Sequence, residues 1–144
     1  MTYGQRATAE SYEEDEIISD LAHHKETVQS FLDLVFNGKR PEEAFAKYVG
    51  AGYIQHNPHA PEGSEASAKH LAGFVSQAPG LSLEIKRVIA EGDLVVTHGL
   101  LKFSPEDRGS AFADIMRLKD GKIVEHWDVV QEVPENPAND NSMF

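Results

Sequence analysis

Ionisable side chains gather near the C-terminal end of the chain. His126 and Asp128 flank the single tryptophan, and Asp114 lies a short distance upstream. A carboxylate in an apolar cavity has its charged form disfavoured, so its pKa rises and it becomes an effective acid or base near neutral pH. A neighbouring histidine can hold that carboxylate in place or donate to a developing enolate oxygen. Asp128 is therefore the leading candidate for a catalytic base, with His126 and Asp114 beside it.

Two further histidines complete the predicted catalytic set. His56 precedes an Asn-Pro pair, and His98 lies in the middle of an expected strand. Each has a structural alternative, since His56 can fix its loop and a strand histidine can be hydrogen-bonded and partly buried. His56, His59, His126 and Asp128 are also metal-ligand types, but His-x-x-His in an Asn-Pro loop lacks the helical spacing of a zincin. We predict no metal site and no cofactor.

The catalytic candidates lie on an expected hairpin over residues 112–131. The Lys-Asp-Gly sequence at 119–121 suits a three-residue turn that ends with a left-handed glycine, which pairs Asp114 with His126. A two-residue loop would instead place Asp114 opposite Trp127. With the three-residue turn, one face carries Phe112, Asp114, Met116, Val124, His126, Asp128 and Val130. The other face carries Ala113, Ile115, Arg117, Ile123, Glu125, Trp127 and Val129. Trp127 is then expected at a dimer interface or under a helix.

The rest of the chain supplies helices first and strands afterwards. Apolar residues recur at steps of three and four from Ile17 to Val35, which predicts an amphipathic helix that ends at Asn37-Gly38. A short helix begins at Pro41, and a third helix follows an irregular loop. From Leu81 the apolar period changes to two and predicts four strands. Helices followed by consecutive strands favour an α+β fold with an antiparallel sheet.

Length and composition limit the possible partners. The 144 residues fit one domain with a real core. We expect a flexible acidic leader over residues 1–14, a domain over 15–135 and a tail over 136–144. The net charge of −11 comes without a basic stripe, so no nucleic acid partner is expected. The chain lacks an apolar run of about 18 residues, a secretory signal and cysteine, so we expect no membrane contact and a cytoplasmic location.

Two segments resemble a known family. Tyr53-Ile-Gln-His-Asn-Pro58 and Asp120-Gly-Lys-Ile-Val-Glu-His-Trp-Asp-Val-Val130 are similar to segments of the SnoaL-like polyketide cyclases, and more narrowly of the predicted SnoaL-like aldol-condensation enzymes. These families belong to the nuclear-transport-factor-two-like superfamily. The resemblance covers about residues 15–135 and implies a cystatin-like cone, in which a curved antiparallel sheet wraps around helices and encloses a cavity. It also implies a homodimer built through the outer face of the sheet.

The resemblance also assigns roles to individual positions. Asp128 falls where cyclases and epoxide hydrolases of the superfamily place an acid/base residue on the last strand. His98 and Leu100 stand where epoxide hydrolases use other side chains, so epoxide hydrolysis is not expected. The tyrosine and paired acids of ketosteroid isomerases are not evident. Beside the catalytic candidates, the residues expected to contact a ligand are Tyr53, Phe74, Phe112, Met116 and Val130.

Two functions remain open at this point. The first is cofactor-free acid/base catalysis on a small hydrophobic carbonyl compound, by aldol-type cyclisation, isomerisation or a related proton transfer. The alternative is a non-catalytic dimeric module that binds a small hydrophobic ligand. Catalysis requires a carboxylate that titrates anomalously inside the cavity, whereas simple binding predicts that Asp128→Asn keeps ligand affinity. A cavity filled by side chains would exclude both functions.

Overall fold

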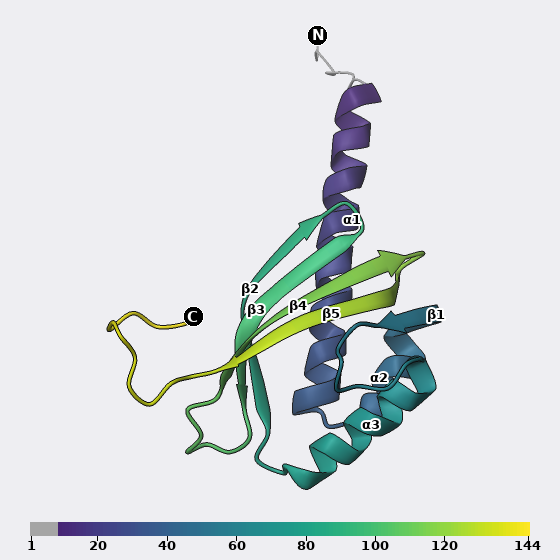
Figure 1. Ribbon diagram of the computed structural model, residues 1–144. Helices are drawn as coiled ribbons and strands as arrows, with labels where there is room; N and C mark the ends of the chain where they lie inside the picture. The colour runs from purple at the N-terminus through teal and green to yellow at the C-terminus, as the bar shows by residue number, and fades with distance from the viewer. Residues whose placement is uncertain (1–8) are drawn as a thin grey trace.

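The computed structural model describes residues 9–144, which form three helices, a π-helical turn and one five-stranded sheet (Figure 1). The helical elements are α1 (Ala9–Leu32), η1 (Asp33–Asn37), α2 (Pro41–Tyr48) and α3 (Ser64–Gln77). The strands are β1 (Val49–Gln55), β2 (Ser82–Glu91), β3 (Leu94–Lys102), β4 (Ser110–Lys119) and β5 (Lys122–Glu132). The predicted α+β class and the order of its elements are confirmed.

The sheet has the strand order β1-β5-β4-β3-β2 and is mixed. Strands β2 to β5 form an antiparallel meander, as predicted, but β1 pairs with β5 in parallel, so the expectation of a purely antiparallel sheet is wrong at that edge. No tight turn joins β1 to β5, and nothing local therefore imposes an antiparallel direction on β1. The pairing continues past β1, where the His56 N–H donates to the His126 carbonyl oxygen at 2.9 Å. Residues 53–57 consequently run beside the second half of the hairpin.

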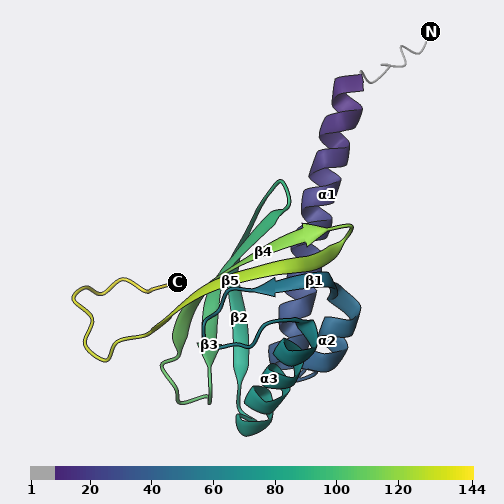
Figure 2. The same cartoon turned by 45° about the vertical axis from the view of Figure 1, so that its right-hand side comes forward.

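The sheet curves around α1, while α2 and α3 lie together near one end (Figures 1 and 2). The first turns of α1 extend past the sheet, and full burial starts only at Thr27 and Val28. Ile17, predicted on the buried face, is 58% exposed because no helix or strand among residues 9–144 packs against that part of α1. Since α1 begins at Ala9, residues 9–14 of the predicted leader are helical, and residues 1–8 lie outside the described part.

The end of the first helical segment is fixed by Asn37. Its amide oxygen accepts the Leu83 backbone N–H at 2.9 Å and its amide nitrogen donates to the Leu83 carbonyl at 3.0 Å. Asn37 thus pairs with β2 much as a strand residue would. The helix ends there as predicted, but Gly38 does not take the left-handed conformation common for a glycine at a helix end, since its φ is −71° and the positive φ falls on Lys39 at 55°. Glycine is still required at position 38, because a Cβ there would lie 2.8 Å from the Leu34 carbonyl oxygen.

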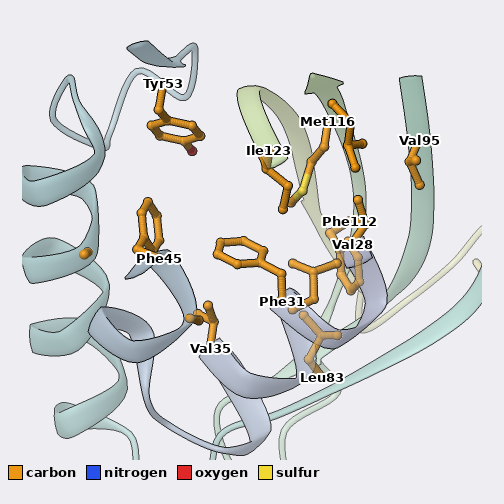
Figure 3. Close-up of a cluster of buried hydrophobic side chains, with 14 residues drawn as sticks. Val28, Phe31, Val35, Phe45, Tyr53, Leu83, Val95, Phe112, Met116 and Ile123 are labelled. Carbon is orange, nitrogen blue, oxygen red and sulfur yellow. The ribbon is translucent and has the colours of Figure 1, made fainter. Parts of the chain in front are cut away.

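The core joins one face of the sheet to the helices (Figure 3). Phe45 of α2 packs edge-to-face against Phe31 of α1 and against Tyr53 of β1, with ring centroids 5.3 and 5.6 Å apart. Such pairs add stability beyond the apolar area they bury. Other buried core residues are Val28, Val35, Leu83, Val95, Phe112, Met116 and Ile123. Tyr53 is therefore held by aromatic packing, and in Figure 3 its hydroxyl points into the interior.

Candidate functional site

A cavity of about 310 Å³ lies between the concave face of the sheet and the helices. Its walls are mostly apolar, with side chains from α1, α3 and the sheet that include Phe31, Leu71, Phe74, Leu101, Met116 and Val130. Polar groups come from β1, the loop after it, β4 and β5: Tyr53, Gln55, Asn57, Asp114, His126 and Asp128. An apolar pocket with a few convergent polar groups is the usual form of a small-molecule site.

The β4–β5 hairpin places three of these polar groups together. Its turn has two residues, Asp120 and Gly121, with φ of 51° and 76°, which suits an Asp-Gly turn of the type that joins two-residue hairpins. The predicted three-residue turn and its register are therefore wrong. A bulge that begins after Arg117 compensates, so Asp114 lies opposite Asp128 and Met116 lies opposite His126.

The bulge also explains why the predicted faces survive at the site. Beyond it, the alternation again places Asp114, His126 and Asp128 on the concave face, as the sequence predicted. On β5, between the turn and the bulge, inward-facing and outward-facing residues are exchanged relative to the prediction. Ile123, predicted on the outer face, is fully buried in the core.

Asp114 and His126 form a buried hydrogen-bonded pair. His126 Nε2 lies 2.9 Å from Asp114 Oδ1, and the two side chains are 13% and 10% exposed. Burial raises the pKa of the Asp114 carboxyl, and the hydrogen bond from His126 opposes this only in part. Burial lowers the pKa of His126, but the hydrogen bond to Asp114 and the charges of Asp114 and Asp128 outweigh it, so the net shift is upward. Both shifts favour retention of a proton by the pair.

Gln55 fixes which nitrogen of His126 carries a proton. The Gln55 side-chain oxygen accepts the Asn57 backbone N–H at 3.0 Å, and the same oxygen lies 2.7 Å from His126 Nδ1. Because a backbone N–H can only donate, this atom of Gln55 must be the oxygen, and Nδ1 must therefore carry hydrogen. The neutral imidazole then presents an unprotonated Nε2 to Asp114. The bond between Nε2 and Asp114 Oδ1 holds one proton, on either atom.

Asp128 is oriented by Asn57. The Asn57 side-chain nitrogen lies 2.9 Å from each carboxylate oxygen of Asp128 and donates to them. The side-chain oxygen of Asn57 accepts the His59 backbone N–H at 2.8 Å, which fixes the orientation of the amide. Asp128 is half-buried and lines the cavity, where its oxygens keep free lone pairs. Of the two carboxylates that line the cavity it is the more exposed, since Asp114 is buried.

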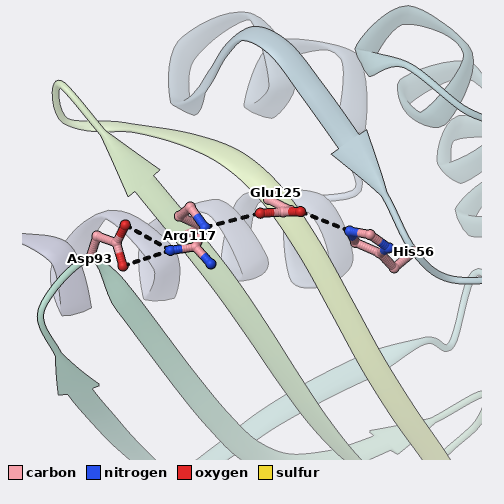
Figure 4. A network of polar contacts seen from close by, with 4 residues as sticks. All are labelled: His56, Asp93, Arg117 and Glu125. Atoms are coloured by element: carbon pink, nitrogen blue, oxygen red, sulfur yellow. Dashed lines mark hydrogen bonds and ion pairs between the residues drawn. The ribbon is translucent and has the colours of Figure 1, made fainter.

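His56 lies on the outer face of the sheet and does not line the cavity (Figure 4). Its Nε2 lies 2.8 Å from Glu125, which also accepts a hydrogen bond from Arg117 Nε at 3.0 Å. Arg117 in turn forms a bidentate contact with Asp93 at 2.8 and 2.9 Å. The His56 ring stacks on Trp127 with centroids 4.8 Å apart. The prediction of a catalytic His56 is corrected to a surface role, and Trp127 lies outside the cavity as expected.

His98 and Phe112 also lie away from the cavity. His98 pairs with Ala113 on the outer face, where it contacts Arg87 and stacks on the C-terminal Phe144 with centroids 6.1 Å apart. Thr97, one residue earlier, occupies the inner face. Phe112 is 4% exposed and its ring lies over Gly99, where a Cβ would come within 2.5 Å of it. Of the predicted contact residues, Tyr53, Phe74, Met116 and Val130 do line the cavity.

Gln55 and Asn57 were missed by sequence reasoning. The usable signal is the period of two along β1, because Tyr53, Gln55 and Asn57 alternate with Ile54 and His56. A strand cannot direct both Tyr53 and His56 into the same cavity.

The same three ionisable groups could share a metal ion. Among the described residues, Asp114, His126 and Asp128 place one ligand atom each within 4.8 Å of one another. Both ring nitrogens of His126 already have partners, Gln55 and Asp114. A metal would have to displace one of them, so the arrangement is better suited to hold and move a proton.

The curved sheet closed by helices, with a polar group of side chains inside an apolar cavity, is the cone of the nuclear-transport-factor-two-like superfamily. Within it, the chain belongs to the SnoaL-like domain family, whose sequence model matches residues 28–126. That range includes Asp114 and His126 and ends just before Asp128. The resemblance inferred from the sequence is therefore confirmed.

Solved structures with the same fold come from several bacteria. A protein from Bacillus cereus provisionally named a polyketide cyclase shares 25% identity and a TM-score of 0.64, over 75% of this chain and 74% of that one. TsrD from Streptomyces laurentii shares 22% identity and a TM-score of 0.60, over 74% and 89%. A SnoaL-like protein from Agrobacterium tumefaciens provisionally named an isomerase shares 16% identity and a TM-score of 0.64, over 76% and 98%. No curated protein sequence matches the chain. Over the described residues, no helix is long and apolar enough to cross a membrane.

Proposed function

We propose that this chain is an acid/base catalyst that acts on a small hydrophobic carbonyl compound bound in the cavity. The observation that carries this proposal is the buried Asp114–His126 pair, which holds one proton beside the oriented carboxylate of Asp128. A base and a proton donor on adjacent strands are what enolisation and aldol-type ring closure require.

Asp128 is the proposed base. It takes a proton from the carbon next to the substrate carbonyl, the C–H electron pair forms the enolate double bond, and the carbonyl oxygen gains the negative charge. Asn57 holds the carboxylate in position, and the apolar wall limits competition from water. The Asp114–His126 pair supplies the second proton, to the oxygen or carbon that becomes basic later in the reaction.

The similar structures support this class of reaction. Two of them carry the provisional names polyketide cyclase and isomerase, and both reactions involve proton transfer near carbonyl groups. The cavity of about 310 Å³ suits a compound of one to three fused rings, and its aromatic and aliphatic walls suit a hydrophobic one. Cyclisation would additionally need the substrate to be folded, which the shape of the cavity can provide.

Proton exchange at carbon tests the proposal without knowledge of the natural substrate. β-Tetralone, a bicyclic ketone with acidic hydrogens beside its carbonyl, is incubated with the protein in D₂O, and deuterium uptake is followed by NMR. We expect the unmodified protein to accelerate uptake. Asp128→Asn should reduce the catalysed rate about 100-fold or more, because an amide cannot take the proton. Asp114→Asn should also reduce it, since the pair then loses its shared proton.

Glu125→Gln is the matched control, because Glu125 is a carboxylate of the same strand that faces outward. It should leave the exchange rate of the folded protein unchanged. The proposal fails if Asp128→Asn exchanges as fast as the unmodified protein. If Asp128→Asn binds β-tetralone normally and neither protein accelerates exchange, the chain is instead a module that binds hydrophobic ligands.

A further inference from the structure

Tyr53 lines the same cavity as the two carboxylates Asp114 and Asp128, and its hydroxyl points into the interior (Figure 3). The residue is 6% exposed and lines the cavity, and its ring is fixed edge-to-face against Phe45. The pKa of its phenol is strongly raised, first by burial and then by the negative charges of Asp114 and Asp128. The hydroxyl therefore keeps its proton over the whole working range of pH. Gln55, which contacts both the Tyr53 oxygen and His126, links it to the proposed acid/base groups.

The hydrogen-bonding state of this hydroxyl is determined by Gln55. The Gln55 side-chain nitrogen donates to the Tyr53 oxygen at 3.0 Å. The second terminal atom of the Gln55 amide accepts the Asn57 backbone N–H and must be the oxygen, so the atom that contacts Tyr53 is the nitrogen. Tyr53 therefore accepts from Gln55 and cannot donate to it. The hydrogen bond from Gln55 is the one found for this hydroxyl among residues 9–144, and in it Tyr53 accepts, so its hydrogen is available to a ligand in the cavity.

We propose that the Tyr53 hydroxyl donates the hydrogen bond that receives the carbonyl oxygen of the substrate, and that Gln55 is the positioning residue that keeps this hydroxyl free to donate. This inference rests on the proposed acid/base function and adds the group that stabilises the oxygen. In the step catalysed by Asp128, the α-proton moves to the Asp128 carboxylate and the charge moves to the carbonyl oxygen. The Tyr53 proton stays on Tyr53, and its hydrogen bond strengthens as that charge grows.

The same Gln55 amide also accepts from His126 Nδ1. One side chain thus controls two proton positions, because it requires a hydrogen on His126 Nδ1 and leaves the Tyr53 hydrogen free. Gln55→Glu separates these effects. A carboxylate still accepts from His126 and from the Asn57 backbone, but it cannot donate to Tyr53. The Tyr53 O–H would then turn and donate to the new carboxylate, away from the cavity.

Binding of a phenolate tests the inference apart from turnover. The Asp128→Asn variant imitates the neutral Asp128 that exists after proton abstraction, and the para-nitrophenolate ion imitates the enolate oxygen. Dissociation constants are measured by absorbance for this probe, and by competition for para-nitrotoluene, which has a methyl group in place of the oxygen. Adding Tyr53→Phe to Asp128→Asn should weaken phenolate binding about 10- to 100-fold and leave nitrotoluene binding unchanged.

Gln55→Glu in the Asp128→Asn background should weaken phenolate binding at least as much as Tyr53→Phe does. Once Tyr53→Phe is present, adding Gln55→Glu should weaken phenolate binding by a smaller factor, because only repulsion between the new carboxylate and the phenolate then remains. Tyr53→Phe keeps the ring and its contact with Phe45, so the variant should fold. Thermal unfolding of each variant checks this.

The inference is overturned if the Asp128→Asn protein shows no preference for phenolate over nitrotoluene, or if Tyr53→Phe leaves the preference unchanged. Neither result would affect the exchange experiment, which tests Asp128 as a base in the unmodified protein. The opposite result is also distinguishable. If the unmodified protein does not accelerate exchange but the preference for phenolate over nitrotoluene still depends on Tyr53, the cavity binds oxyanions and Asp128 is not the base.

Discussion

Asp114 carries a carboxylate that titrates together with His126. The pKa of each group is raised in the folded protein, Asp114 by burial and His126 by its hydrogen bond to Asp114 against the effect of burial. The folded pair therefore keeps a proton at pH values where the unfolded chain has lost it. A raised pKa contributes stability below the unfolded value, and this contribution is lost as the pH rises through the folded value. For His126 the unfolded value is about 6.5.

We predict that the free energy of unfolding falls as the pH rises above 6.5, with a slope of at most about 1.4 kcal/mol per pH unit for one proton. Asp114→Asn should remove this slope, because burial then acts on His126 without its main partner. Urea unfolding at a series of pH values measures the difference between the two proteins, in which the other histidines cancel. Identical pH dependence in both proteins would contradict a shared proton between Asp114 and His126.

The polar residues of the cavity differ in how far the sequence predicts them. His126 and Asp128 could be assigned to one face because they alternate along one strand, whereas Asp114 shares that face because the bulge after Arg117 offsets the wrong turn prediction. Their partners could not be assigned, because Gln55 and Asn57 reach them from a strand more than 50 residues away, and a parallel pairing leaves no local turn signal. Long-range contacts of this kind depend on the complete fold.

At the scale of elements, alternation decides which predictions hold. Residue type and resemblance point to His56 and His98 as catalytic groups, but each lies an odd number of positions from an inward-facing neighbour, Tyr53 or Thr97. Alternation thus contradicts two predictions, whereas a β-bulge preserves one. The bulge after Arg117 corrected a wrong turn prediction, so the face of Asp114 was right although its expected partner was not. Bulges insert one residue without a clear sequence signal, which is why register was the least predictable feature.

The β4–β5 turn sets this register and depends on Gly121. Its φ of 76° is costly for any residue with a Cβ, while a Cβ there would meet no atom within 4 Å. We predict that Gly121→Ala lowers the free energy of unfolding by about 1 kcal/mol through backbone conformation alone. Gly73 is the matched control, because it also has open space but lies inside α3. Gly73→Ala should raise stability by up to about 1 kcal/mol.

Chemical denaturation of both glycine variants gives the comparison directly. Equal effects of the two substitutions would mean that the turn does not need a left-handed residue. A different turn would also change the register between β4 and β5 and move Asp128 relative to Asp114. In that case Gly121→Ala should lower the rate of β-tetralone exchange as well.

At the scale of the whole molecule, the two faces of the sheet differ in what covers them. The concave face is closed by helices, whereas no helix of the described residues covers the outer face, where Phe144 of the C-terminal tail stacks on His98 (Figure 1). Ile89 of β2 and Val129 of β5 lie on that face and are 60% and 70% exposed. Trp127 contacts the His56 ring and the Arg117 guanidinium on the same face. Exposed apolar side chains gathered on one sheet face suit association with a second copy.

We therefore expect a homodimer through the outer face, and we predict that the combined variant Ile89→Glu with Val129→Glu is a monomer. Across a two-fold axis each new carboxylate would meet the same surface of the partner, so burial and like-charge repulsion both oppose association. Sedimentation velocity over a range of concentrations should give twice the mass of one chain for the unmodified protein and the mass of one chain for the variant.

Ile18→Glu is the control for this experiment, because Ile18 is 64% exposed but lies on the first turns of α1, away from the sheet. It should remain dimeric. A dimer that survives both changes in the sheet but dissociates on Ile18→Glu would mean that α1 carries the interface, and a monomeric unmodified protein would exclude association altogether. The cavity lies on the other face, so a monomeric outer-face variant should keep β-tetralone exchange, which separates assembly from catalysis.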